Sequence, residues 1–468
     1  MSITVIVALV ALVAFVALKL RGNTKITSFK EQGGVPFFAA ALAYAQNPVA
    51  TIRRATSQAG NIFSIQLFTV YNVWLRGNDL NKVYLETRED TWSFGGGMGI
   101  FLNRILDGGY WPHLRTLAGS LAHWLNRSAT LDYVTKVSNE EAEKSFSNWS
   151  TKSDVELFES VSGLVHQVIV RCLMGQDFYD KSCSELLDLL HAMEADIGSL
   201  YNMFLPAWVS HPPAKRLDAA RERVREIFNQ RLQERSMDPE TWSKSSDYIN
   251  YTLSDKTMLP LKDLLPSHHT LLMFAAHTST VANIAWAIIE ILRHPDILAE
   301  LQKTLRESPE EADSLLLQAC IKETSRFYAG MSTLRIARKD HTIPTTSINV
   351  PAGALVSISP YLTHHDPANF SNPDQWTPDR WISQEGGIVQ LDQKQGLKYI
   401  PFGAGSHRCV GEKMAAIVAS RALSTLIRNY NVEWANGEPR SEVTDFDFGK
   451  LGTPWLKGDT RVKVTKRV

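Results

Sequence analysis

The chain has 468 residues, 49 basic and 49 acidic side chains, and 44% hydrophobic residues. A chain of this length can bury a large core. Its balanced charge argues against a dedicated nucleic-acid binder, because such proteins carry a basic excess or a basic stripe. The four cysteines are scattered and form no Cys-x-x-Cys pair, which disfavours a disulfide framework and a zinc site.

The first apolar segment lies at the N-terminus. Ile3–Leu18 is apolar apart from Thr4, and basic residues follow it but do not precede it. A secretory signal would begin with its positive charge and end in a small-residue cleavage site. We therefore predict an uncleaved, single-pass membrane anchor over residues 1–21 and one domain over residues 22–468, which the positive-inside rule places in the cytosol. A cleaved signal and a buried core helix are the alternatives.

The rest of the chain predicts long helices between shorter strands. Gly33–Gly60 is typical of short helices, and Ile62–Trp74 of two strands. Helical periodicity dominates over Trp111–Arg326. Strand-like runs return over Thr333–Ile358, and Glu412–Tyr430 predicts a further helix. We predict a mainly α fold with small peripheral β-sheets; no dinucleotide or P-loop motif accompanies it.

A long apolar helix is predicted over Leu264–His294, and its middle carries Phe274-Ala-Ala-His277-Thr278-Ser279. A threonine in such a helix can bond to a carbonyl of the preceding turn, and a histidine there can be a satisfied core residue. Alternatively, the pair delivers protons inside a pocket that excludes water. The residues alone leave both interpretations open.

The strongest local pattern is the loop Phe402-Gly-Ala-Gly405-Ser-His407-Arg-Cys409-Val-Gly411. Glycines let the backbone approach a flat macrocycle, and the helix that starts after Cys409 favours a negative sulfur. Such a thiolate suits haem iron, to which it donates electron density. We expect Phe402 to shield the sulfur from water and His407 to reach a haem propionate. A free cysteine beside a glycine loop is the alternative.

Phe402, Gly405, Cys409 and Gly411 match the F-x-x-G-x-x-x-C-x-G ligand loop of the cytochrome P-450 superfamily, which the chain resembles over essentially its whole length after the anchor. The resemblance implies the cytochrome P-450 fold and haem b with Cys409 as the axial ligand of the iron. It implies a monooxygenase that inserts one oxygen atom from O2 into a lipophilic substrate. It also implies an NADPH-dependent flavoprotein reductase as electron partner and a place in the endoplasmic reticulum membrane, with the catalytic domain cytosolic.

Two further segments resemble those that build a structural ion network in this superfamily. They are Lys322-Glu323-Thr-Ser-Arg326 and Trp376-Thr-Pro-Asp-Arg380-Trp381. A buried carboxylate needs cationic partners, because unpaired burial costs several kcal/mol. The resemblance therefore implies a folding and haem-retention role for Glu323, Arg326 and Arg380.

Other matches concern the two faces of the haem. Trp111-Pro-His-Leu-Arg115 resembles the family's W-x-x-x-R helix, and Arg335 resembles a second arginine that binds a propionate. The forked guanidinium suits a carboxylate, although either arginine taken singly would be a surface residue. Thr278 fits the threonine that helps deliver protons to oxygen, while His277 stands where the family usually has Asp or Glu.

The His277–Thr278 pair and Trp92-Ser-Phe-Gly95 resemble the sterol 14-demethylase-like branch, whereas Ala329-Gly330 departs from its usual His-Pro-Pro. We therefore expect a relative in fungal specialised-metabolite biosynthesis that acts on a terpenoid, steroid or polyketide. The alternatives are sterol 14-demethylase itself, a non-catalytic haem-binding protein, and an isomerase or dehydratase acting on peroxides.

Overall fold

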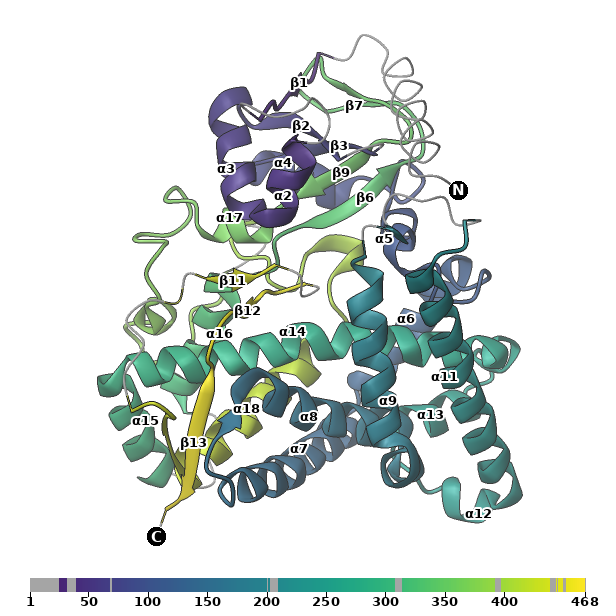
Figure 1. The fold of residues 1–468 in the computed structure, drawn as a ribbon, viewed down its shortest axis with the longest axis vertical. Helices are drawn as coiled ribbons and strands as arrows, with labels where there is room; N and C mark the ends of the chain where they lie inside the picture. Colours follow the sequence, from purple (N-terminus) through teal and green to yellow (C-terminus); the bar gives the residue numbers. More distant parts are fainter. Residues whose placement is uncertain are drawn as a thin grey trace.

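The computed structural model describes residues 25–31, 39–67, 70–199, 201–202, 209–307, 314–391, 397–437, 443, 445–448 and 452–467. A part built around a mixed sheet lies at one end of the molecule, beside a larger helical part (Figure 1). The long helix α14 (Leu265–Arg293) runs across the helical part. The predicted anchor over residues 1–21 lies outside the described residues.

The largest sheet has six strands in the order β1-β2-β3-β9-β6-β4. β2 and β3 pair antiparallel from Ile62↔Leu75 to Leu67↔Val70, which confirms the two strands predicted over this segment. β6 and β9 pair antiparallel within the segment where strands were predicted to return. The strands are β1 (Thr27–Ser28), β2 (Ile62–Leu67), β3 (Val70–Leu75), β4 (Trp92–Ser93), β6 (Thr333–Ala337) and β9 (Leu355–Ile358).

The described residues also form three smaller sheets, in the orders β10-β13-β5, β11-β12 and β7-β8, and the β7-β8 pair lies beside the large sheet (Figure 1). In β13 the side chains alternate between exposed and buried, and its valines face the core, as a strand with one covered face requires. The strands are β5 (Val155–Glu156), β7 (His341–Thr342), β8 (Asn349–Val350), β10 (Tyr430–Trp434), β11 (Phe446–Asp447), β12 (Trp455–Leu456) and β13 (Arg461–Lys466).

The helices follow the predicted ranges closely. Their capping fits the sequence: Asn47, Ser93 and Ser314 accept backbone N–H groups at the starts of α3, α5 and α16. Besides α14, the helices are α2 (Ala39–Gln46), α3 (Pro48–Ala59), α4 (Asn78–Glu86), α5 (Phe94–Leu102), η1 (Trp111–His113), α6 (Leu114–Leu125), α7 (Ser128–Trp149), α8 (Leu157–Ile169), η2 (Val170–Met174), α9 (Gln176–Ile197), α11 (Pro212–Met237), α12 (Pro239–Trp242), α13 (Tyr248–Ser254), η3 (Leu259–Leu264), α15 (Pro295–Glu307), α16 (Leu315–Phe327), α17 (Pro360–His364), η4 (Pro378–Trp381), η6 (Gly405–His407) and α18 (Glu412–Asn429).

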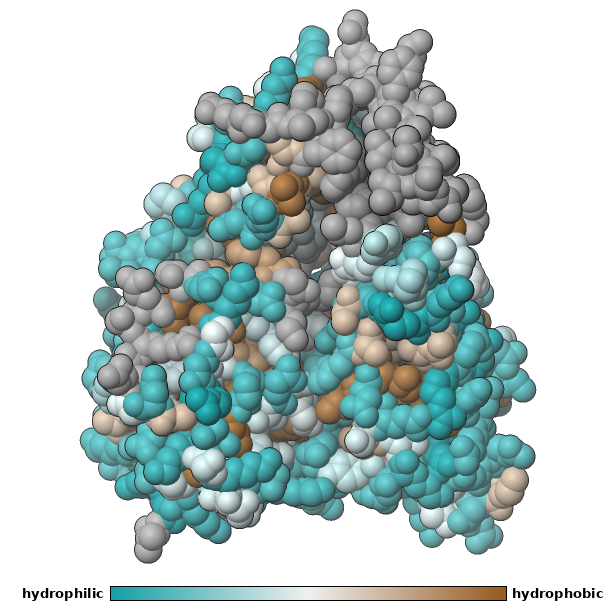
Figure 2. All heavy atoms as spheres, in the orientation of Figure 1, coloured by the Kyte–Doolittle hydropathy of each residue, from teal (hydrophilic) through white to brown (hydrophobic). Residues whose placement is uncertain are grey.

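The helical core is centred on α14, which packs against α8, α16, α18 and α11. Two apolar stretches, Leu157–Met174 and Leu259–Arg293, are long enough to cross a membrane, but 72% of an apolar 18-residue window in each is buried inside the protein. Burial on this scale explains their hydrophobicity as that of core helices. Hydrophilic side chains cover most of the described surface of the helical part in Figure 2. The structure thus confirms the mainly α fold with small sheets.

Candidate active site around Cys409

The loop before α18 is closed by backbone contacts. The Cys409 N–H donates to the Phe402 carbonyl at 2.9 Å. Gly403 and Gly405 have φ values of 67° and 68°, in the left-handed region that favours glycine. A Cβ on Gly405 would also lie 3.1 Å from the Leu85 carbonyl oxygen. The glycines therefore fix the shape of the loop and let it approach the end of α4.

Cys409 differs from the other three cysteines in its surroundings. Its side chain is exposed, whereas Cys172 and Cys320 are buried and Cys183 is half-buried. Protein atoms around the sulfur raise the pKa of the Cys409 thiol by desolvation, while N–H groups of Gly411 and Glu412 bond to the sulfur and act against this rise. These two N–H groups lie at the start of α18, where the helix dipole also favours a thiolate.

The middle of α14 has one open face. Ala275 and Ser279 are exposed although most of the helix is buried, and Thr278 beside them is half-buried. The Thr278 hydroxyl donates to the Phe274 carbonyl at 3.3 Å, which is the local back-bond that the sequence allowed. Gly452 lies against the same hydroxyl, since a Cβ there would be 3.7 Å from it.

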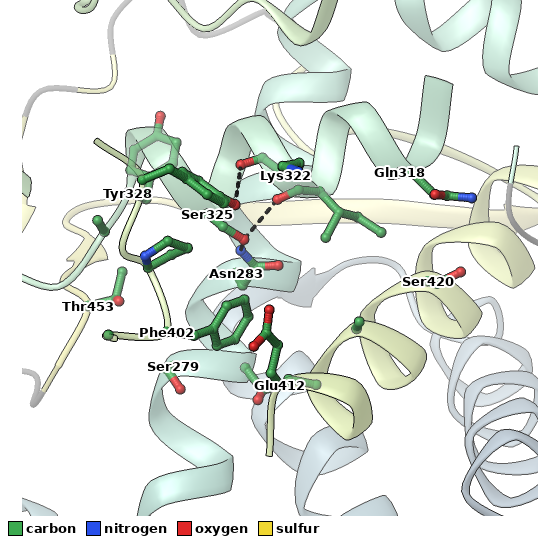
Figure 3. Close-up of a pocket in the computed structure, with 18 of the residues that line it drawn as sticks. Ser279, Asn283, Gln318, Lys322, Ser325, Tyr328, Phe402, Glu412, Ser420 and Thr453 are labelled. Atoms are coloured by element: carbon green, nitrogen blue, oxygen red, sulfur yellow. Dashed lines mark hydrogen bonds between the residues drawn. The ribbon is translucent and has the colours of Figure 1, made fainter. Parts of the chain in front are cut away.

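A cavity of about 470 Å³ lies between this face of α14, α16, α18 and the loop that carries Cys409 (Figure 3). In Figure 3, Phe402 on the loop and Glu412 on α18 lie across the cavity from Asn283 on α14. Asn283 donates to the Ser325 hydroxyl at 2.9 Å and so ties α14 to α16. The lining includes Ser279, Thr280, Asn283, Ser325, Tyr328, Gly330, Phe402, Gly403, Arg408, Glu412 and Thr453.

His277 lies on the other side of α14. At about 100° per residue, it is opposite Ala275 and Ser279, and it is fully buried. Its Nε2 lies 3.0 Å from the Ser162 hydroxyl, and its Nδ1 lies 3.5 Å from the Glu194 carboxylate. The structure thus places His277 next to Thr278 in the chain but turned away from the cavity, toward α8 and α9.

The surroundings of His277 are a buried polar cluster. Ser162 also contacts His191 at 3.0 Å. The ring of His166 lies edge-on to that of His277, with 6.1 Å between centroids. Burial, with the nearby His277, lowers the pKa of His166 to about 3, so that this ring is neutral at pH 7. Sequence analysis did not find these partners, because they come from helices distant in the chain.

The two predicted propionate arginines have different environments. Arg335 is 1% exposed; its Nη1 donates to the Thr87 carbonyl at 2.7 Å, and its guanidinium lies over the Tyr84 ring at 4.7 Å. The Arg335 Nε has no hydrogen-bond partner among the residues that the structure describes. Arg115 is exposed at the start of α6. Trp111 is half-buried and donates to Asn103 at 2.6 Å.

The predicted ion network is assembled in full. The Glu323 carboxylate, fully buried, accepts from Arg326 at 2.8 and 2.9 Å and from Arg380 at 3.0 Å. The Trp381 indole and the Thr377 N–H each donate to it at 2.8 Å. The remaining Arg326 donors reach backbone carbonyls of the segment that precedes Arg380 and of α17. Every charge in the network is therefore paired, as burial requires.

His407 has a partner that sequence analysis missed. Its Nε2 lies 3.1 Å from the Glu89 carboxylate, and its ring stacks on Phe94 with centroids 4.8 Å apart. Burial raises the pKa of Glu89, but hydrogen bonds from His407, Ser93 and two backbone N–H groups outweigh this and hold it at about 2. An acidic residue just before a serine-capped, glycine-rich helix indicates that Glu89 caps α5, but no local pattern identifies it as the partner of His407.

Comparison with known proteins places these features in a family. The family model for cytochrome P450 matches residues 30–455. The chain belongs to the cytochrome P450 family. The cytochrome P450 monooxygenase pynD of Aspergillus niger is 46% identical over 473 residues, which cover 99% of this chain and 98% of that protein. The cytochrome P450 monooxygenase pytD of Aspergillus terreus is 48% identical over 377 residues, or 78% of this chain and 99% of that protein.

More distant similarities agree with the fold. The sterol 14-alpha demethylase CYP51A of Gibberella zeae is 26% identical over 470 residues, which cover 92% of each chain. The solved structure of retinoic acid-bound cyanobacterial CYP120A1 superposes with a TM-score of 0.74 at 18% identity, over 95% of this chain and all of that one. The chain therefore has the cytochrome P450 fold, and its cofactor is haem b held by a cysteine thiolate.

The residues of this P450 fit that cofactor. Cys409 is the exposed cysteine, and N–H groups at the start of α18 offset part of the desolvation that raises the pKa of its thiol. A Cβ on Gly411 would lie 3.8 Å from the sulfur, so glycine there keeps space beside it. The buried Arg335 keeps an Nε donor that a haem propionate could accept from. The open face of α14 supplies small residues across the cavity from the loop.

Proposed function

We propose that Cys409 is the axial ligand and that this P450 inserts one oxygen atom from O2 into an unactivated C–H or C=C of a lipophilic substrate. The observation that carries the proposal is the cavity itself, which is lined by Phe402 and Arg408 of the loop that contains Cys409 and, from α14, by the exposed Ser279. When bound, the haem supplies the binding and reductive activation of dioxygen. The protein residues bind, orient, exclude water and move protons.

Phe402, Gly405 and Gly411 shape the loop around the sulfur. Phe402 lines the cavity and would shield the sulfur from water once the cofactor is bound. Gly405, with its positive φ, sets the turn, and Gly411 leaves room beside the sulfur. Together they would hold the Cys409 sulfur where a bound haem could take it as ligand, and would limit the access of competing proton donors.

Thr278 and His277 serve proton delivery in this proposal. Thr278 is half-buried on the open face of α14, next to Ser279, which lines the cavity, and rotation would free its hydroxyl from the Phe274 carbonyl to donate on that face. His277 reaches the polar cluster on the other face, through Ser162 and Glu194. The two side chains leave α14 on different faces and share no hydrogen bond, so a proton from the His277 cluster would need a bridging group to reach Thr278.

Four residues would hold the haem propionates, namely Trp111, Arg115, Arg335 and His407. Arg335 is the best supported, because it is buried with an unpaired donor. His407 already bonds to Glu89, so it would bridge that carboxylate and a propionate. Glu323, Arg326 and Arg380 would act at a distance, by fixing α16 and the segment that leads to the loop.

The proposed substrate class is a terpenoid, steroid or polyketide of fungal specialised metabolism. The relatives at 46–48% identity are Aspergillus monooxygenases, whereas the sterol demethylases are 24–27% identical. This difference favours a specialised role over sterol 14-demethylation. Small lining residues, Ser279, Gly330 and Thr453, leave room for a bulky substrate.

We also propose an N-terminal anchor over residues 1–21 in the endoplasmic reticulum membrane, with residues 22–468 in the cytosol as one haem domain. Its support is the apolar run followed by basic residues. Electrons would come from an NADPH-dependent flavoprotein reductase. P450 enzymes generally depend on redox partners, and this chain carries no flavin or nicotinamide motif of its own.

The test combines two optical measurements on the purified holoprotein. The carbon monoxide difference spectrum reports thiolate ligation, and titration with terpenoids, steroids, polyketides and a 14-methyl sterol reports displacement of water from the iron. We expect thiolate ligation and a high-spin shift with a compound other than the sterol. A shift with the sterol alone, followed by its demethylation with reductase, would instead establish sterol 14-demethylase. Thiolate ligation without oxygen consumption for any compound would establish a non-catalytic haem protein.

A further inference from the structure

Glu89 joins two parts of the site that are distant in sequence. On one side its carboxylate accepts from Ser93 Oγ at 2.6 Å and from the N–H groups of Phe94 and Gly95 at 2.8 and 3.2 Å. These donors form the N-terminus of α5. On the other side it contacts His407 of the ligand loop at 3.1 Å. One carboxylate therefore satisfies orphan donors at a helix start and holds a loop side chain.

The glycine-rich helix α5 is itself packed tightly against β6 and η1, the segments that carry Arg335 and Trp111. A Cβ on Gly97 would lie 2.8 Å from the Arg335 Cα, and one on Gly95 would lie 3.3 Å from the Trp111 ring. Such close backbone contacts leave α5 little freedom to shift relative to β6 and η1. Glu89 thus connects the loop that carries Cys409 to the segments that carry Arg335 and Trp111.

A second contact follows the same route. Phe94, the first residue of α5, stacks on the His407 ring with centroids 4.8 Å apart. Arg338, at the end of β6, donates to Ser93 Oγ at 2.9 Å, so the same serine is held from the sheet. The stack and the Arg338 bond hold His407 and Ser93, to which Glu89 itself bonds, and an uncharged side chain at position 89 would be a weaker acceptor for both.

We infer that Glu89 is a positioning residue for haem-thiolate ligation: through His407 it holds the ligand loop in register with α5, and so keeps the Cys409 sulfur fixed relative to the propionate side of the site. Glu89 acts through His407 and does not touch the cofactor in this scheme. The inference rests on the proposed role of Cys409. It adds a requirement that the ligand-loop motif does not contain, because Glu89 lies 320 residues before Cys409.

The test compares holoprotein carrying Glu89→Gln with holoprotein carrying Glu86→Gln. Glu86 ends α4 three residues earlier, has an exposed side chain and pairs only loosely with Lys82, at 4.0 Å. The measurement is the rate at which the reduced carbon monoxide complex loses its thiolate-ligated band on mild heating. We expect Glu89→Gln to lose the band about tenfold faster, from the loss of one charge-assisted hydrogen bond, and Glu86→Gln to match the parent protein.

A double-mutant cycle decides whether Glu89 acts through His407. If it does, Glu89→Gln has a much smaller effect on the rate in a His407→Gln background than in the parent protein, because only its bonds to the start of α5 are then left to lose. Equal rates in the parent protein and Glu89→Gln, or effects of the two substitutions that simply multiply, would overturn the inference. Hydrogen exchange at residues 93–99 should rise in Glu89→Gln but not in Glu86→Gln. Unchanged exchange in Glu89→Gln would also count against the inference. Absence of the thiolate band in the parent protein would be a failure of the Cys409 assignment, which is a separate result.

Discussion

The ligand loop and the middle of α14 face one cavity but are built by different means. In the loop, backbone bonds and left-handed glycines set the shape, as at Gly405. In α14 the backbone is regular, and the environment of each side chain depends on which neighbouring helix covers it. Ser279 therefore faces the cavity while His277, two positions earlier, is buried between α8 and α9.

This difference separates local from tertiary information. A loop made by glycine conformations tolerates few sequences, so its motif is recognisable without any knowledge of the fold. A helix face acquires its role only when the partner helices are in place. We therefore expect loop substitutions to act on ligation and stability, and α14 substitutions to act on proton delivery with ligation intact.

Cys409→Ser should have the largest effect, because a serine hydroxyl cannot replace the thiolate as the electron donor to iron. We expect complete loss of the thiolate-ligated carbon monoxide band and of monooxygenase activity. Cys183→Ser is the matched control, since that half-buried cysteine lies away from the loop. Retention of the band in Cys409→Ser would show that Cys409 is not the axial ligand.

Thr278→Ala should separate ligation from proton delivery. We expect a normal carbon monoxide spectrum. The fraction of consumed NADPH that is recovered as product should fall by roughly tenfold, because a positioned proton donor accelerates the proton-transfer step by about 10²-fold or more. Thr270→Ala is the control and should change this fraction little, because the Thr270 hydroxyl makes the same type of back-bond, to Pro266, on a part of α14 that does not line the cavity. Equal coupling in the two variants would mean that the Thr278 hydroxyl only back-bonds to Phe274.

Gly405→Ala tests the backbone of the loop. A Cβ at φ 68°, 3.1 Å from the Leu85 carbonyl, should cost about 1–2 kcal/mol of unfolding free energy. Gly163→Ala is the counterpart within α8, where a Cβ would meet nothing within 4 Å. That change should stabilise the helix by about 0.5–1 kcal/mol. Urea unfolding of both holoproteins measures the contrast, and two shifts of the same sign would contradict it.

The smallest effect concerns pH on the far side of α14. Burial lowers the pKa of His166 from 6.5 to about 3, so the unfolded chain takes up a proton below pH 6.5 that the folded protein refuses. Its contribution is present above pH 6.5 and is lost as the pH falls toward 3. Between pH 7 and 5.5 the unfolding free energy should fall by about 1 kcal/mol from this ring.

His166→Gln should flatten that part of the stability curve. His123→Gln, at an exposed position on α6, should leave the curve as in the parent protein. Urea unfolding at pH 7 and 5.5 gives the difference directly. The same slope in His166→Gln as in the parent protein would show that the ring is not kept neutral by burial.

The sequence was sufficient for the fold class, for the ends of α14 and α18, and for the loop around Cys409. It also predicted that Glu323, Arg326 and Arg380 would meet, which their hydrogen bonds confirm. These features depend on local periodicity or on motifs with fixed spacing. They can be recognised before the chain is folded in space.

What the sequence could not provide were contacts between distant segments. Glu89 and His407 are 318 residues apart, and nothing local marks them as partners. The orientation of His277 likewise follows from the packing of α8 and α9 around α14. Arg115 is exposed and Arg335 is buried, and this difference depends on where α6 and β6 lie in the fold.

The most direct test of monooxygenase function is turnover under ¹⁸O-labelled dioxygen. The holoprotein is supplied with reductase, NADPH and the compound that gives the largest high-spin shift. The product should carry one labelled oxygen atom per oxidation, and Cys409→Ser should form none. A product oxidised without the label, or formed equally well from a peroxide without reductase, would contradict the monooxygenase assignment.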